Sequence, residues 1–135
     1  MESPPSNPVR YTFAREERLR SKKLIESLFA GGRIVTAPGL RLHWIETTNS
    51  TPVQVAFAVP KRAFRKATDR NLIRRRLREA YRLHKHRVHN LLNAQGKCAA
   101  LMITFTGKQA LEYKEVEDKI ILLLQRFTDK LCGKP

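Results

Sequence analysis

The segment RNLIRRRLREAYR, residues 70–82, threads apolar side chains between arginines at helical spacing. At about 100° per residue, one side of a helix running from about 70 to 93 collects mostly apolar residues, and we expect that side to face a core. Its members are Ile73, Leu77, Ala80, Tyr81, Val88, Leu91 and Leu92. Thr68 or Asp69 is the predicted N-cap, and Gly96 is the predicted end of the helix.

The neighbouring side of the same helix is cationic. It carries Arg70, Asn71, Arg74, Arg75, Arg78 and Arg82, and the preceding connection adds Lys61, Arg62, Arg65 and Lys66. Residues 61–89 hold a net charge of +10, out of +15 for the whole chain of 135 residues. Like charges four residues apart on a helix repel each other, and a bound polyanion would offset this electrostatic repulsion. Arginine also suits bidentate contacts to phosphate, which favours a nucleic acid as the partner.

Three other interpretations of this charge remain open. A charged run is often only a solvated helix face. An anionic membrane surface also attracts cations, but it requires an exposed apolar face, and the apolar side here is predicted to face the core. A DNA-reading helix normally follows another helix, whereas a predicted β-hairpin precedes this one.

The rest of the chain predicts a single α/β domain over residues 13–131, after a flexible tail at 1–12. Helical spacing marks 15–30 and about 111–131, and alternation marks strands at 40–47 and 53–59, which we expect to pair as a hairpin. The apolar run 98–105 is typical of a buried strand. The predicted order is α-β-β-α-β-α, with a further short strand around Ile34 and Val35 left open.

Several features bear on location and chemistry. The sequence shows no apolar run typical of a signal peptide or a membrane-spanning helix, so we expect a cytoplasmic protein with no membrane partner. Cys98 and Cys132 are far apart in the sequence, so we expect two free thiols. No paired carboxylates or activated nucleophile point to catalytic residues. His84 is expected on the apolar side of the long helix and His86 and His89 on the cationic side, so no metal site is expected on the protein.

Three segments, in this order, resemble a known family. FAREERL (13–19) with LIESLFAGG (24–32), then VAFAVPKR (55–62), then the arginine helix are similar to the protein subunit of bacterial ribonuclease P. Arg70 and Asn71 match the start of its arginine signature, and Leu72 replaces the usual third arginine. Arg74, Arg75, Arg78, Glu79 and Tyr81 match the remainder. The likeness covers roughly residues 13–130.

The resemblance implies a fold and a role. The fold would be a two-layer α+β sandwich with a left-handed βαβ crossover, like a ribosomal-protein domain. The chain would act as one subunit of an endoribonuclease that removes the 5′ leader of precursor tRNA. A catalytic RNA, paired 1:1 with the protein, would carry the chemistry with Mg²⁺ that it binds itself.

The resemblance also implies two binding surfaces. The cationic helix and its connection would bind the ribonuclease P RNA. A cleft would hold the single-stranded leader, with Ile25, Phe29, His43, Trp44 and Phe57 as candidate lining residues. Ile25 stands where the family usually has an aromatic residue, and the connection 61–69 lacks the family's glycine. Two alternatives remain: a general RNA-binding module of this fold, and a stand-alone nuclease, against which the absence of acidic metal ligands argues.

Overall fold

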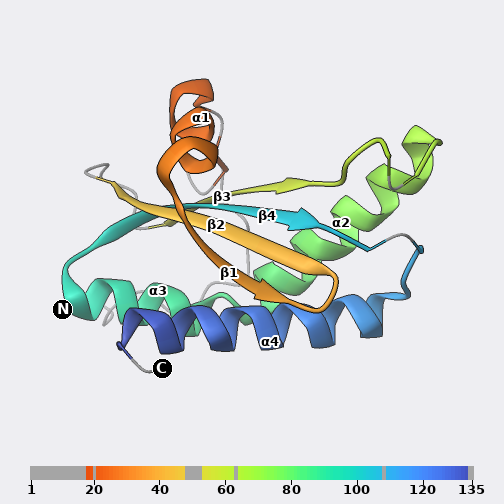
Figure 1. Ribbon diagram of the computed structural model, residues 1–135. Helices are drawn as coiled ribbons and strands as arrows, with labels where there is room; N and C mark the ends of the chain where they lie inside the picture. The colour runs from red at the N-terminus through yellow and green to blue at the C-terminus, as the bar shows by residue number, and fades with distance from the viewer. Residues whose placement is uncertain (1–17, 20, 48–52, 63, 108, 134–135) are drawn as a thin grey trace, which may run out of the picture.

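The computed structural model describes residues 18–19, 21–47, 53–62, 64–107 and 109–133. One four-stranded sheet carries helices on both faces (Figure 1). In chain order the elements are α1 (Lys22–Gly31), β1 (Arg33–Ala37), β2 (Leu40–Thr47), β3 (Val53–Ala58), α2 (Ala67–His84), α3 (His86–Gln95), β4 (Cys98–Phe105) and α4 (Tyr113–Leu131). The predicted α+β class is confirmed, and the strand left open around Ile34 and Val35 is β1. The predicted tail at 1–12 lies outside the described residues.

The strand order in the sheet is β1-β2-β4-β3. The predicted hairpin between residues 40–47 and 53–59 is therefore wrong, because β4 lies between β2 and β3. β4 pairs antiparallel with β2 and parallel with β3. The hairpin that does form joins β1 to β2, through a tight turn in which Gly39 has a φ of 81°. The reason lies in β4, which is apolar on both faces and gains most from an interior position with a ladder on each edge.

The parallel pair β3 and β4 requires a crossover, which α2 and α3 supply. In Figure 1 both strands point to the right, the chain returns beneath the sheet, and β4 lies nearer the viewer than β3. That path is left-handed, as the resemblance implied, although right-handed crossovers are the strong default.

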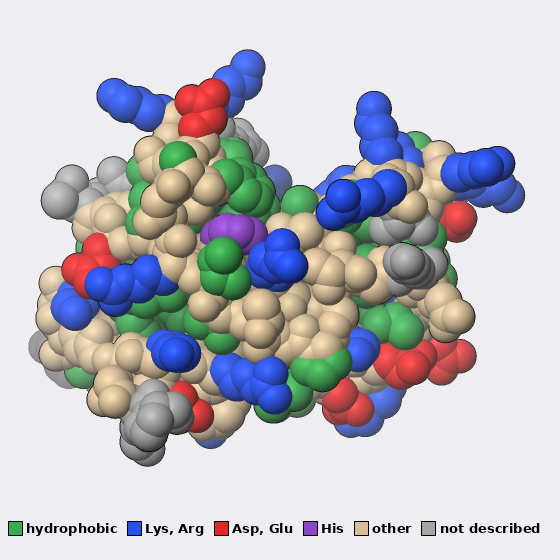
Figure 2. Space-filling model, in the orientation of Figure 1, with side chains coloured by type: hydrophobic (Ala, Val, Ile, Leu, Met, Phe, Trp, Pro, Cys, Tyr) green, Lys and Arg blue, Asp and Glu red, His purple; other side chains and the backbone are tan. Residues whose placement is uncertain are grey.

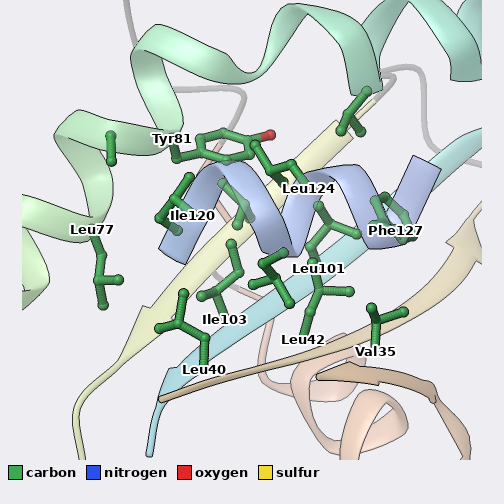
Figure 3. Close-up of a cluster of buried hydrophobic side chains, with 14 of the residues drawn as sticks. Val35, Leu40, Leu42, Leu77, Tyr81, Leu101, Ile103, Ile120, Leu124 and Phe127 are labelled. Carbon is green, nitrogen blue, oxygen red and sulfur yellow. The ribbon is translucent and has the colours of Figure 1, made fainter. Parts of the chain in front are cut away.

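The main core fills the space between the sheet and helices α2, α3 and α4 (Figure 3). Alternate residues of the strands point into it, including Leu42 of β2 and Leu101 and Ile103 of β4, all with no exposed surface. Tyr81 and Phe127 enter from the helices and are equally buried. The predicted apolar side of the arginine helix is thus confirmed at Ile73, Leu77, Ala80 and Tyr81.

A second, smaller core lies on the opposite face, beneath α1. Leu19 and Leu28 pack there against Ala100 and Met102 of β4. The predicted helix at 15–30 begins too early, because Leu19 instead donates its backbone N–H to the carbonyl of Val55 on β3. Ser21 then caps α1 by accepting from the backbone N–H of Leu24, and the helix covers only Lys22–Gly31.

The long helix predicted from 70 to 93 is two helices. α2 ends at His84 and α3 begins at His86, on either side of the buried Lys85. No glycine or proline marks the break in the sequence. α2 also starts earlier than expected, with Lys66 as its N-cap, so Thr68 and Asp69 lie inside its first turn.

α4 completes the layer beneath the sheet. A capping box between Glu112 and Glu115 fixes its first turn, and its buried face runs from Val116 to Thr128. Among the described residues, no helix is both long and apolar enough to cross a lipid bilayer.

Candidate RNA-binding surface

The cationic side of α2 faces away from the main core. Arg75 is exposed, and Arg74 and Arg78 are half-buried, one turn apart on the flank beside the buried Ile73 and Leu77. The helix-wheel expectation therefore places these arginines correctly relative to the core. Their role as RNA contacts remains a prediction.

Arg70 differs from the other arginines of this side. Its guanidinium donates to the carbonyl oxygen of Phe64 at 2.8 Å and to that of Arg65 at 3.1 Å. These two bonds hold the connection before α2 against the first turn of the helix. Arg70 thus shapes the surface that carries Arg65 and Lys66 as well as adding charge to it.

Arg78 sits in a strongly positive environment. Burial lowers the pKa of its guanidinium, and the charges of Arg18 and Arg74 lower that pKa further. Its Nε atom is buried and has no hydrogen-bond partner within the described ranges. Arg74 reaches back to the side-chain oxygen of Asn71 at 2.7 Å. A phosphate is the ligand that such a cluster of guanidinium groups suits best.

Arg18 is the member of this cluster that sequence reasoning missed. It forms an isolated parallel bridge with Val55 of β3, which brings it beside α2. Arg18 belongs to the segment FAREERL, but no periodicity links it to a helix more than fifty residues later. Only the tertiary structure brings the two together.

Arg82 is partly neutralised. It forms a two-point ion pair with Glu79, with Nη2 and Oε2 2.6 Å apart, and this hydrogen bonding lowers the pKa of the Glu79 carboxyl. The pair offers a polyanion less positive charge than Arg74, Arg75 or Arg78 does. We therefore predict that Arg82 contributes least to RNA binding among the candidate arginines of α2.

The connection before α2 concentrates positive charge at the N-terminus of that helix. Lys61, Arg62, Arg65 and Lys66 are all exposed. Cations are unfavourable at a helix N-terminus, where the helix dipole is itself positive, and Asp69 is the one acid in the first turn. An anion bound here would offset both the side-chain charges and the dipole.

Helix α1 projects from the same surface, on the other side from the start of α2. Figure 2 shows lysine and arginine side chains on α1 and again near the start of α2, with a lower surface between them. The floor of this depression is the α1-facing side of the sheet, built from small or flexible side chains such as Ala56, Ala58 and Met102. We call this the leader cleft, after the role that the resemblance predicts for it.

Three of the five predicted cleft residues meet at the α1 end of the floor. The rings of Phe29 and His43 are 4.8 Å apart and tilted by 57°, and Ile25, one turn before Phe29 on α1, is half-buried against the smaller core. Phe29 is 56% exposed, which is high for a large apolar side chain and leaves its ring available for stacking. His43 is buried, and burial, followed by the nearby charge of Arg41, lowers the pKa of its imidazole. The lowered pKa favours the neutral form of the His43 imidazole.

The placement expected for Trp44 and Phe57 is wrong. Both point to the other side of the sheet, where Trp44 packs edge-on against Phe127 at 5.2 Å and Phe57 against Tyr81 at 5.7 Å. Successive strand residues alternate between faces, so Trp44 cannot share a cleft with His43. The sequence did contain this signal, because Leu40, Leu42 and Trp44 alternate with Arg41, His43 and Ile45.

Two histidines of α2 and α3 contact other side chains of the protein. His84, expected on the core side, is half-exposed and contacts the carboxylate of Glu117 at 2.9 Å, while His89 contacts the hydroxyl of Tyr81 at 3.1 Å. In the part of the chain that the structure describes, no three His, Cys, Asp or Glu side chains cluster in a way that would hold a metal ion. Cys98 and Cys132 are free thiols.

Comparison with known proteins agrees with this geometry. A family model described as Ribonuclease P matches residues 13–128. Among curated proteins, the ribonuclease P protein component of Porphyromonas gingivalis is 25% identical over 114 residues, covering 83% of each chain. That of Chlorobium phaeobacteroides is 37% identical over 82 residues, covering 57% of this chain and 56% of the other.

Solved structures show the same fold. The RNase P protein of Staphylococcus aureus has a TM-score of 0.65 and 14% identity, and the match covers 81% of this chain and 93% of that one. The RNase P protein of Thermotoga maritima has a TM-score of 0.61 and 20% identity, with 82% and 96% covered. With a family match that spans most of its length and a fold shared with these structures, this chain belongs to the ribonuclease P family.

Proposed function

We propose that this chain is the protein component of a ribonuclease P and works in the 5′ processing of tRNA. The observation that carries the proposal is the arginine surface of α2, formed by Arg74, Arg75 and Arg78, on a chain whose family match covers residues 13–128. Few acids offset these charges, which makes the surface suited to the phosphates of a folded RNA.

In this proposal, two surfaces of the protein bind two different RNAs. The arginine surface and the connection before α2 bind the catalytic RNA, with one protein per RNA. The leader cleft, with Phe29 and His43, holds the single-stranded 5′ leader of precursor tRNA, since an exposed aromatic ring stacks on any base. Binding the two RNAs on one cationic protein lowers the repulsion between them.

Magnesium belongs to the RNA in this proposal. The described side chains supply no cluster of oxygen ligands, and the surface that would face RNA is cationic, so it does not suit a divalent cation. When bound to RNA phosphates, Mg²⁺ would activate the water that hydrolyses the phosphodiester. The protein residues orient the leader and reduce electrostatic repulsion, and none of them acts as acid or base.

The test is 5′ cleavage of a precursor tRNA at low Mg²⁺, with the cognate ribonuclease P RNA, in the presence and absence of the protein. Strong stimulation that requires both components supports the proposal. Tight RNA binding without stimulation would favour a general RNA-binding module instead. Cleavage by the protein alone would contradict the assignment of the chemistry to RNA.

A further inference from the structure

Helix α4 exposes two large apolar side chains at its midpoint. Ile121 is 42% exposed and Leu122 is 37% exposed, whereas Ile120, Leu123 and Leu124 are buried in the main core. In Figure 1, α4 forms the lower edge of the molecule, with the sheet and α2 above it. This apolar pair belongs neither to the arginine surface nor to the leader cleft.

A hollow of about 340 Å³ lies beside Ile121, between α4 and the break that separates α2 from α3. Leu83 and Ile121 supply apolar surface to it. The guanidinium of Arg87 donates to the side-chain oxygen of Gln125, which joins the two walls. The hollow extends the apolar surface at the middle of α4 and gives room for an aliphatic side chain from a partner.

The apolar pair lies on the other flank of α2 from the arginine surface. Arg76 marks the α4 flank, because its guanidinium donates to the carbonyl oxygen of Leu111, just before α4. Arg74 and Arg78 are two positions from Arg76 along the helix, so each points about 160° away from it. A partner bound at Ile121 would therefore leave both arginines free for RNA.

The two halves of α4 differ in the sign of their charge. Residues 112–119 contain four acids and two bases, whereas residues 125–131 contain two bases and one acid. When two copies of α4 lie antiparallel, the acidic half of one lies along the basic half of the other. Such an arrangement gives electrostatic complementarity without any further partner.

A two-fold axis between Ile121 and Leu122 gives this arrangement a specific register. Lys114, Asp118, Ile121 and Gln125 follow one another at spacings of four, three and four residues, so they share one side of the helix. The axis brings the apolar pairs of both copies together at the centre. Moving outward, the facing residues are Asp118 with Gln125 and Lys114 with Asp129, each of which occurs twice by symmetry. A register one residue later would instead set Glu115 against Asp129, two like charges.

We propose that the outer face of α4 binds a second copy of this chain, as an antiparallel two-fold pair of α4 helices centred between Ile121 and Leu122. The inference goes beyond the proposed function and does not depend on it. RNA is a poorer occupant of this face, because the carboxylates of Glu115, Asp118 and Asp129 repel phosphates. The net charge of +15 opposes self-association, so added salt strengthens the pair, whereas it weakens RNA binding.

The experiment is sedimentation equilibrium of the full chain, free of nucleic acid, from micromolar to millimolar protein and at low and high KCl. We expect an equilibrium between monomer and dimer that shifts toward the dimer as KCl rises. Ile121→Asp should raise the dissociation constant at least about 10-fold. Ile34→Ser is the control, because Ile34 is 52% exposed but pairs with His43 on the other face of the sheet.

Charge reversal tests the register. Lys114→Glu and Asp129→Lys should each weaken the dimer, and the double variant should restore it. The two positions are 15 residues apart on one helix, or about 22 Å, so restoration can arise only from contact between copies. Thermal unfolding of each variant shows that any loss of association occurs in a folded protein.

Three results would overturn the inference. They are a wild type that stays monomeric at every concentration, a dimer that Ile121→Asp leaves unchanged, and a double charge reversal without restoration. Association that ribonuclease treatment abolishes would also contradict it, because RNA would then bridge the copies. Each of these results is independent of the cleavage assay, so failure of the inference is distinguishable from failure of the proposed function.

Discussion

The guanidinium of Arg70 donates to the backbone carbonyl of Phe64 at 2.8 Å, so the first arginine of the helix signature is bound to its own protein. A second bond, to the carbonyl of Arg65, completes the clamp. The arginines of this surface therefore fall into two classes: Arg70 builds the connection, whereas Arg74, Arg75 and Arg78 are the ones that we predict to contact RNA. The two classes predict different effects of mutation.

Arg70→Lys should destabilise the fold by about 1–2 kcal/mol, because an ammonium group cannot reach both carbonyl oxygens at once. The charge is retained, so a loss of RNA affinity would come from a displaced connection. Urea unfolding, compared with Arg75→Lys as the control on an exposed site, measures the effect. Equal stability of the two variants would contradict the clamp.

Arg74→Ala and Arg78→Ala should each weaken binding to the RNA subunit. Each should reduce the slope of log K against log salt concentration by about 1, because one phosphate contact is lost. Filter binding over a series of KCl concentrations gives the slope. Arg82→Ala should change it less, since Arg82 is already paired with Glu79. A larger effect at Arg82 would reverse this ranking.

Phe29→Ala and Trp44→Ala should separate binding from stability. Phe29 is 56% exposed, so its loss should change stability by less than about 1 kcal/mol but weaken binding of a leader about 10-fold. Trp44 is buried against Phe127, so its loss should cost about 3–5 kcal/mol. Thermal unfolding and precursor affinity are measured on both variants. A leader-specific defect in a stable Trp44→Ala protein would show that the faces are misassigned.

Glu117→Gln should alter the dependence of stability on pH. The hydrogen bond from His84 holds the pKa of the Glu117 carboxyl below its ordinary value of 4.5. A lowered carboxyl pKa stabilises the folded state above pH 4.5, and this contribution is lost as the pH falls through the lower, folded-state pKa. The wild type should thus exceed the variant in unfolding free energy near neutrality, and the gap should close in acid.

Chemical denaturation at a series of pH values measures this gap. Glu26→Gln, which removes an exposed carboxylate from α1, is the control. A difference between wild type and Glu117→Gln that stays constant from neutral pH to below pH 4.5 would show that the His84–Glu117 contact does not act through ionisation.

Gly107→Ala should destabilise the protein by about 1–3 kcal/mol, because the added methyl group meets the fully packed ring of Phe105. Gly96→Ala is a useful comparison, since the positive φ of 67° at the C-cap of α3 penalises any side chain although the space around it is open. Unfolding free energies of both variants measure the two effects. A neutral Gly107→Ala would imply that the ring moves freely.

Periodicity in the sequence predicted which faces of the helices and strands are buried. The 3.6-residue repeat around Ile73 and Leu77 identified both the core side and the cationic side of α2, because neighbours on a helix surface are close in sequence. The same holds for strands, where alternation at His43 and Trp44 separates the two faces of the sheet. Both patterns are local, so the sequence reveals them without knowledge of the fold.

The tertiary structure alone decided which distant segments meet. Residues 40–47 and 53–59 are close in sequence, yet the largely apolar β4 separates them, because an interior strand buries both faces and pairs on both edges. The same long-range pairing sets Arg41 beside Thr104, and it sets Arg18 beside Arg78. The sequence by itself determined the faces of each element and their charge. Which faces combine into a binding surface depends on pairing between residues far apart in the chain, and no local repeat encodes that.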